Sequence, residues 1–291
     1  MSFDFTKHTG IDYGFSFRTL TEVPETDVAT YCSKLRQQYA ALTKGWTGEL
    51  NTQWFCRNYL AVKMILAATV MLTSESYAER KNLKIVGPYL LYYATLCCCR
   101  AVVFGVPEQR WSDELYEMSH SKILNIAIDS VRHFSKSLGE EADRVCREAQ
   151  ATRELFSYQF PAEGTSVGRS TRPADWDSVL RVCRILAELA QLRSECLESA
   201  VSRHATGEYP VDSAILERCY IYETDAERFI DDDDVYRINH WMRRSKRPYN
   251  LCQIATEGLV DDFFGAWVPV DTAEEDAYNP DEDKRLIFPF N

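Results

Sequence analysis

Residues 87–104 read GPYLLYYATLCCCRAVVF, and this stretch decides the fold. Its residues are almost all apolar or small, so the helix that they predict has no face suited to water and must be buried. Arg100 is the one charged side chain in the stretch. Because an unpaired buried charge is costly, Arg100 needs a partner or a route to solvent. The nearest downstream histidine that could share its site is His120, in the sequence SHSKILN of residues 119–125.

Apolar residues recur at helical spacing on both sides of this stretch. The pattern continues from about residue 27 to residue 246, and no segment alternates with period two over several residues. Glycine, proline and capping residues divide the pattern into segments. We predict helices over about residues 27–44, 52–79, 88–104, 119–136, 140–160, 175–204, 213–229 and 235–246. The fold class is therefore mainly α, with almost no sheet.

Composition divides the 291-residue chain into four parts. The clearest loop is PAEGTSVGRSTRPAD, residues 161–175, which is rich in Gly, Ser, Thr and Pro. The chain ends in LIFPF followed by Asn291, and we expect this apolar end to dock in an extended form into a groove on this chain or on a partner. The four parts are an aromatic arm (residues 1–25), a helical bundle (26–165), a C-terminal helical region packed on the bundle (174–265) and an acidic tail with an apolar end (271–291).

The net charge of −11 argues against broad, sequence-independent binding of nucleic acid, which needs a basic surface. The ten cysteines include no CxxC pair and no Cys/His cluster at zinc spacing, so we expect reduced, buried thiols. The chain also contains no Gly-rich phosphate loop, GxSxG elbow or HExxH motif. We therefore predict no metal and no cofactor.

Neither targeting nor membrane insertion is evident from the sequence. The N-terminus, MSFDFTKHTG, lacks the apolar core of a signal peptide. The apolar segments of residues 59–73 and 85–106 are respectively too short and interrupted by Pro88 and Arg100, so neither looks like a membrane span. We expect a cytoplasmic protein.

Four short motifs lie in a fixed order along three predicted helices: YYA at residues 92–94, RAVV at 100–103, SHSK at 119–122 and RELFSY at 153–158. Residues 27–160 thereby resemble the HEPN superfamily (higher eukaryotes and prokaryotes nucleotide-binding domain). Many of its members show a YYA…RALL helix, a THK-like helix start and an R-x-x-A-D-Y-like helix end. The resemblance implies a multi-helix, up-and-down bundle that is commonly dimeric.

Members of this superfamily include metal-independent ribonucleases of toxin–antitoxin and phage-defence systems, and also nucleotide-binding or partner-binding modules. The nuclease signature is an arginine followed by four to six residues and a histidine. None of the five histidines here has an arginine five to seven positions earlier. The resemblance therefore implies a non-catalytic module that binds a partner or acts in regulation. The alternative is a divergent endoribonuclease that uses Arg100 and His120.

The candidate catalytic residues are Arg100 and His120. An arginine can hold a phosphate in a bidentate manner, and a histidine can act in acid–base chemistry near neutral pH. The structural alternative is that Arg100 pairs with a carboxylate such as Glu154 while His120 begins a helix. Tyr92 and Tyr93 are likewise either core residues or platforms for a base.

A second set of candidates consists of basic residues that could bind a phosphate or an acidic partner. The acidic run of residues 231–234 precedes most of them, and we expect it to cap the following helix. We also expect a homodimer or a complex with another protein, with RNA or a nucleotide as further candidate ligands, and an interface formed by Trp111 and the aromatic arm (Phe3, Phe5, Phe15 and Phe17). The basic candidates are Lys122, Arg237, Arg243, Arg244, Lys246 and Arg247.

Overall fold

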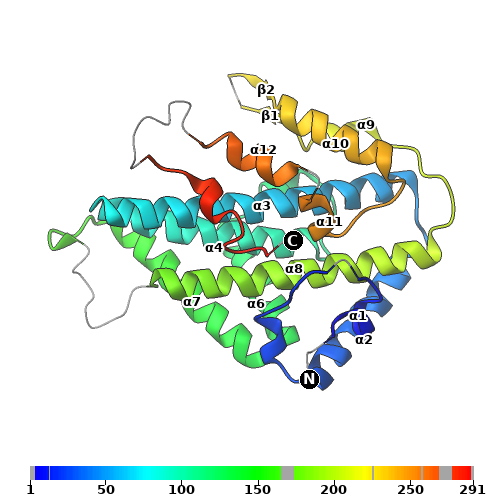
Figure 1. Ribbon diagram of the computed structural model, residues 1–291, viewed down its shortest axis with the longest axis horizontal. Helices are drawn as coiled ribbons and strands as arrows, with labels where there is room; N and C mark the ends of the chain where they lie inside the picture. Colours follow the sequence, from blue (N-terminus) through cyan, green and yellow to red (C-terminus); the bar gives the residue numbers. More distant parts are fainter. Residues whose placement is uncertain are drawn as a thin grey trace.

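The computed structural model describes residues 4–12, 14–164, 174–224, 226–256, 258–268 and 277–289. It is mainly α-helical, which confirms the predicted fold class. Figure 1 shows α3, α4 and α8 side by side along the long axis, with α6 and α7 on one side and α10 on the other. The long helices are α2 (Glu25–Thr43), α3 (Gly48–Arg80), α4 (Gly87–Phe104), α6 (His120–Phe134), α7 (Lys136–Tyr158), α8 (Trp176–His204) and α10 (Asp232–Arg244).

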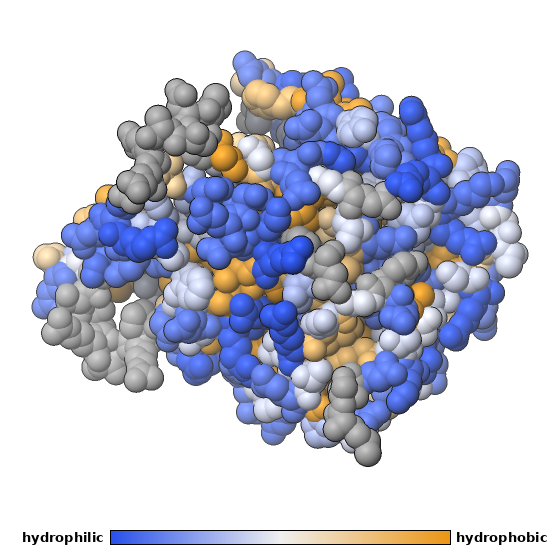
Figure 2. Space-filling model, viewed as in Figure 1, coloured by the Kyte–Doolittle hydropathy of each residue, from blue (hydrophilic) through white to orange (hydrophobic). Residues whose placement is uncertain are grey.

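Shorter elements connect and cover these helices. Among the described residues, the two strands β1 (Ile221–Glu223) and β2 (Arg228–Ile230) form one antiparallel hairpin, with Ile221 opposite Ile230. Figure 2 shows that hydrophilic residues cover most of the viewed face, with hydrophobic residues between them in separate patches. The other short helices are α1 (Thr6–Thr9), η1 (Leu20–Glu22), η2 (Lys84–Val86), α5 (Asp113–Tyr116), α9 (Ser213–Glu217), α11 (Leu251–Ala255), α12 (Leu259–Gly265) and η4 (Pro280–Asp283).

The hairpin replaces part of a predicted helix, so the prediction of a helix over residues 213–229 was wrong beyond Glu217. Thr224 explains the turn between the strands, because its hydroxyl accepts hydrogen bonds from the backbone N–H groups of Ala226 and Glu227 at 3.3 and 3.0 Å. Such local side-chain bonds compete with helix formation.

Helix α4 lies at the centre, in contact with α3, α6, α7 and α8. Residues from the predicted bundle and from α8 share one continuous hydrophobic core. The segments Gly48–Arg80 and Lys84–Phe104 are long and apolar enough to cross a membrane by length and composition, and 78% and 56% of their most apolar windows is buried inside the protein. Buried core helices also meet this criterion.

Two buried arginines hold the C-terminal end of α4. Arg57 of α3 donates to the carbonyl oxygen of Phe104 at 3.1 Å and to two further carbonyl oxygens in residues 106–109. Arg193 of α8 donates to the carbonyl oxygen of Gly105 at 3.4 Å, and the Tyr39 hydroxyl donates to the same oxygen at 2.7 Å. Burial lowers the pKa of Arg57 to about 10. The positive charges suit the partial negative charge at a helix C-terminus.

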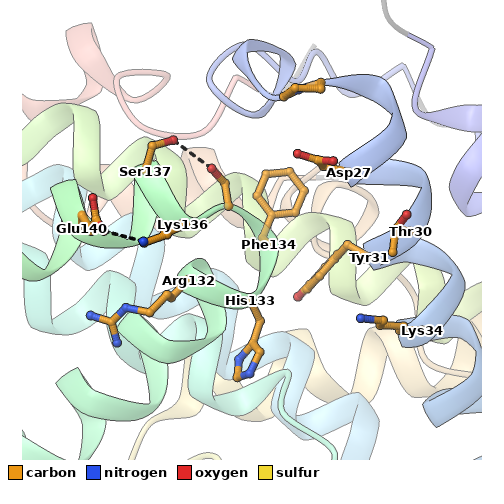
Figure 3. A pocket seen from close by; sticks show the side chains of 12 residues that line it. Asp27, Thr30, Tyr31, Lys34, Arg132, His133, Phe134, Lys136, Ser137 and Glu140 are labelled. Atoms are coloured by element: carbon orange, nitrogen blue, oxygen red, sulfur yellow. Dashed lines mark hydrogen bonds and ion pairs between the residues drawn. The ribbon is translucent and has the colours of Figure 1, made fainter.

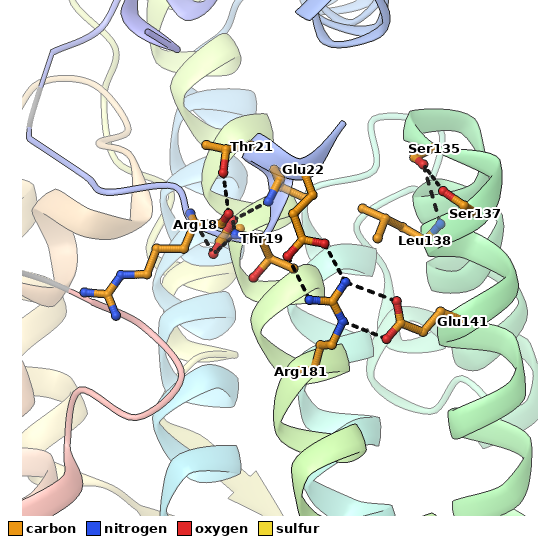
Figure 4. A network of polar contacts seen from close by, with 11 residues as sticks. Arg18, Thr19, Thr21, Glu22, Ser135, Ser137, Leu138, Glu141 and Arg181 are labelled. Atoms are coloured by element: carbon orange, nitrogen blue, oxygen red, sulfur yellow. Dashed lines mark hydrogen bonds and ion pairs between the residues drawn. The ribbon is translucent and has the colours of Figure 1, made fainter. Parts of the chain in front are cut away.

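Ion pairs and capping bonds fasten the N-terminal arm to α7 and α8 (Figure 4). The guanidinium of Arg181 bridges Glu22 of η1 at 2.7 Å and Glu141 of α7 at 2.8 Å. The carboxylate of Glu188 accepts three backbone N–H groups of residues 18–20. A carboxylate at the start of a helical turn satisfies N–H groups that have no partner inside the turn.

Three described phenylalanines of the arm, Phe5, Phe15 and Phe17, pack against the rest of the chain. Phe5 is buried and stacks on Phe17 with ring centroids 4.0 Å apart. Phe15 lies 4.8 Å from Phe288, and both Ile287 and Phe288 are buried, so the apolar end of the tail docks on this chain. Trp111 is half-buried and lies against the guanidinium of Arg57. Phe3, the loop residues 165–173, and residues 271–276 and 290–291 of the predicted tail lie outside the described residues.

All ten cysteines are free thiols, and nine of them are buried. Burial raises the pKa of Cys97 to about 12 and that of Cys252 to about 11. The reactive thiolate is therefore disfavoured in the folded protein. Eight of the thiols adjoin one another in pairs between elements: Cys98 with Cys183, Cys99 with Cys146, Cys32 with Cys196 and Cys56 with Cys219.

We expect Phe288→Ala to lower the free energy of unfolding by about 3–5 kcal/mol, because it leaves a cavity where the chain end meets the arm. Chemical denaturation measures this loss. The matched control is Phe229→Ala, since the Phe229 side chain is half exposed. Equal, small losses in the two variants would contradict the docking of the chain end.

We expect a thiol reagent to modify all ten cysteines only after denaturation in guanidinium without reductant. In the native protein, burial of the thiols should delay the reaction until the chain unfolds. Absorbance of the released chromophore gives the count. Fewer than ten reactive thiols after denaturation, or several that react at once in the native protein, would contradict this picture.

Candidate functional site

Three helices bring five side chains together into what we call the α4–α6–α7 cluster: Tyr92, Tyr93, Arg100, His120 and Arg153. Tyr93 and Arg100 are seven residues apart, so they lie on the same face of α4, two turns from each other. His120 is the first residue of α6, and Arg153 lies near the end of α7. Because α4 packs against both α6 and α7, these residues meet although they are far apart in sequence.

His120 is held by the two tyrosines. Its Nδ1 atom is 2.9 Å from the hydroxyl of Tyr92, and its ring meets Tyr93 edge to face at 6.0 Å between centroids. Burial lowers the pKa of His120, and the positive charges of Arg100 and Arg153 lower it further. Near neutral pH the imidazole is therefore mainly uncharged, and one of its nitrogens can accept a proton.

Arg153 lies over the ring of Tyr92, with its guanidinium carbon 4.8 Å from the ring centroid. Burial opposes the charge of Arg153, but hydrogen bonds to the hydroxyls of Tyr92 and Tyr158 raise its pKa overall. Its Nε atom is buried and has no hydrogen-bond partner among the described residues. A buried donor without a partner is costly, and a bound acceptor would satisfy it.

Arg100 donates to the carbonyl oxygen of Tyr116 in α5 at 3.2 Å. In the described part of the chain, it forms no ion pair with Glu154, which was the structural alternative for this arginine. Glu154 instead accepts a hydrogen bond from Gln150 at 3.0 Å. The charge of Arg100 thus remains available close to His120.

The start of α6 adds a further source of positive potential. Ser119 precedes the helix but its side chain forms no capping bond. The first backbone N–H groups of a helix have no partner inside the helix, and the helix dipole places partial positive charge there. Lys122 is exposed in this same turn. Such a helix end is suited to an anion.

Solvent reaches the cluster through its aromatic residues. Tyr93 is 37% exposed, and Tyr158, which interacts with Arg153, is 79% exposed. Exposed aromatic faces next to arginines are the arrangement on which single-stranded nucleic acids stack. The cluster therefore combines donors for a phosphate with surfaces for a base.

The remaining basic candidates lie elsewhere. Figure 1 shows α10 at the top of the molecule, whereas α6 and α7 lie at the bottom. Arg237 forms an ion pair with Asp262, and Lys246 forms one with Glu208 at 2.5 Å. Arg243 and Arg244 are exposed at the end of the helix, and Arg247 follows it half-buried. Of the six basic candidates, the structure thus places only Lys122 near His120.

The acidic run before α10 has the predicted capping role. The side chain of Asp231 accepts a hydrogen bond from the backbone N–H of Asp234, which confirms that it caps α10. Asp234 itself is buried, pairs with Lys63 of α3 and accepts a hydrogen bond from the Tyr59 hydroxyl at 2.6 Å. This pair fastens α10 to the body of the protein.

Sequence reasoning placed Arg153 only in the motif at the end of its helix and did not identify it as a site residue. The motif was a usable signal, because it lies where α7 meets α4.

No group of three or more His, Cys, Asp or Glu side chains in the described ranges could hold a metal ion. No family model, curated protein or solved structure matches this chain.

We expect Arg153→Met to raise the pKa of His120 toward its ordinary value of 6.5, because the variant removes one of the two charges that oppose protonation. Titration of the histidine by NMR measures this change. Arg147→Met is the matched control, since Arg147 lies on the same helix and pairs with Asp143. Equal effects of the two substitutions would contradict a direct interaction between Arg153 and His120.

Proposed function

We propose that this chain is a non-catalytic, HEPN-like helical protein whose α4–α6–α7 cluster binds a phosphate group of an RNA strand or a nucleotide. One observation carries the proposal: Arg153 lies over the ring of Tyr92, whose hydroxyl is 2.9 Å from Nδ1 of His120, and Arg100 is close enough to act on the same histidine. Charge-assisted hydrogen bonds from arginine suit phosphate oxygens. The unpartnered Nε of Arg153 supplies a further donor.

The charge distribution supports a small, local contact. The chain carries a net charge of −11, which repels the extended backbone of a duplex. Two arginines and the start of α6 form a confined positive site within this acidic protein. Tyr93 and Tyr158 offer exposed rings for unpaired bases, so a single strand or a free nucleotide fits better than a double helix.

A second candidate function is metal-independent cleavage of RNA. It is favoured by the lowered pKa of His120, because a neutral imidazole can act as a general base. Cleavage also needs a group that protonates the leaving oxygen. Burial raises the pKa of Tyr92, the group hydrogen-bonded to His120, so its hydroxyl is a weak acid near neutral pH. Together with the missing Arg-x4–6-His spacing, this favours binding over cleavage.

The HEPN resemblance extends the proposal to the cellular role. It suggests a regulatory or partner-binding part of a phage-defence or toxin–antitoxin assembly in the cytoplasm. The protein would act there as a homodimer or in a complex with another protein. Light scattering measures the molar mass of the purified protein, alone and together with any chain that co-purifies, and so reports this association.

We expect a short, single-stranded, fluorescent oligoribonucleotide to bind the protein, and Arg100→Ala or Arg153→Ala to weaken binding about tenfold or more. Each variant loses a charge-assisted hydrogen bond, which contributes about 1.5–3 kcal/mol. Fluorescence anisotropy measures the affinity. Arg243→Ala is the control, because Arg243 is exposed on α10, away from the cluster.

The same samples separate the two candidate functions when they are incubated with tRNA and total RNA. We expect the RNA to stay intact with the wild-type protein. Cleavage that disappears in both Arg100→Ala and His120→Ala would favour the nuclease instead. If all variants bind the oligoribonucleotide with the same affinity, the cluster is not the binding site.

A further inference from the structure

A groove separates α2 from the end of α6 and the start of α7, on a different part of α6 from His120. Two adjoining cavities form it, an outer one of about 610 Å³ and an inner one of about 350 Å³. Both are lined by Tyr31, Lys34 and His133, and we call them together the α2–α6 groove. Figure 3 shows Lys34 on α2 and His133 on α6 on opposite sides of the outer cavity. Cavities of this size typically hold small molecules.

The inner cavity combines an apolar lining with a buried positive charge. Leu35, Val106 and Ile126 supply apolar surface, and Arg193 contributes from α8. Arg193 is only 7% exposed. Its Nε atom donates to the hydroxyl of Tyr31 at 3.1 Å, and its other bond goes to a backbone carbonyl. In the ranges that the structure describes, no carboxylate forms an ion pair with it.

Two buried arginines, Arg57 and Arg193, lie at this end of the inner cavity or next to it. Arg57 and Arg193 both face the C-terminal end of α4, and a helix end carries only about half a negative charge. Glu108 also acts on Arg193, but its carboxylate is exposed and accepts a hydrogen bond from Gln38 at 3.1 Å. Burial opposes the charge of Arg193, but the groups around it outweigh this and raise its pKa, so the side chain stays charged. Because no carboxylate in the described ranges forms an ion pair with it, Arg193 can attract an anion in the inner cavity.

The rim of the groove offers further groups for an anion. The side chains of Lys34 and His133 have no hydrogen bond or ion pair with any described residue. Four acidic side chains also line the groove, and each has a partner. Asp129 pairs with Arg132 at 2.7 Å, Glu140 lies 3.8 Å from Lys136, Asp27 accepts a hydrogen bond from the Thr26 hydroxyl at 3.4 Å, and Glu108 accepts the bond from Gln38. Lys34 is therefore the cation of the rim that remains available to a ligand.

We propose that the α2–α6 groove binds a small organic anion. Its carboxylate or phosphate group interacts with Lys34 and Arg193, and its apolar body packs on Leu35, Val106 and Ile126. The site is separate from the α4–α6–α7 cluster, so this proposal does not depend on the function proposed for that cluster.

Titration of the full chain with three probes of similar size tests the site: benzoate, phenyl phosphate and the neutral benzyl alcohol. NMR shifts of the groove residues report binding. We expect at least one anion to bind about tenfold more tightly than benzyl alcohol, because it gains charge-assisted hydrogen bonds. The comparison of benzoate with phenyl phosphate identifies the preferred charged group.

The test uses substitutions of exposed lysines on α2, because replacing an exposed side chain should not disturb the fold. Lys34→Ala should weaken binding of the preferred anion at least about threefold, since one charged contact is lost. The affinity for benzyl alcohol should stay unchanged. Lys44→Ala is the matched control, because Lys44 is exposed at the end of the same helix and lines neither cavity. Equal affinity for all three probes, or equal losses in the two lysine variants, would overturn the proposal.

Discussion

The hydrogen bonds from Arg57 and Arg193 to the C-terminal end of α4 are the constraint on which the rest of the structure depends. Helix α4 is almost wholly apolar, so hydrophobic burial alone leaves it free to slide along its axis. Hydrogen bonds are directional, and those from two buried guanidinium groups to carbonyl oxygens fix its position and end. They join α3, α4 and α8 at one point, with Tyr39 of α2 bonded to the same helix end.

Both proposed sites follow from the position of α4. At one site, Tyr92, Tyr93 and Arg100 meet the start of α6 and the end of α7 because α4 lies between these helices and α3. At the other, Arg193 lines a cavity while it donates to the end of α4, and it forms no ion pair with a carboxylate among the described residues. The same side chain thus contributes to the core and to the proposed anion site. Arginine suits both proposed sites, because its planar guanidinium group can donate to a carbonyl oxygen and to a ligand at once.

The candidate site was only partly predictable. The pattern pointed to Arg100 and His120 because a charge in an apolar helix and a histidine at a helix start are unusual, and the charge of Arg100 does act on His120. The role of Arg153 depends on how closely α7 approaches Tyr92, and sequence spacing does not give that distance. The segment at residues 237–247 is basic in sequence, but sequence does not show that two of its charges pair with Asp262 and Glu208.

The sequence by itself determined the helical class, the central place of α4 and the cap of α10, because apolar periodicity and capping are local properties. It did not determine the hairpin after α9, where a side-chain turn at Thr224 outweighs helical spacing. Nor did it identify Arg57, Arg193 or the α2–α6 groove. The partners of these arginines are backbone carbonyl oxygens, which every residue carries, and a cavity arises only from the mutual fit of helices. Only the tertiary structure, through packing between distant segments, decided these features.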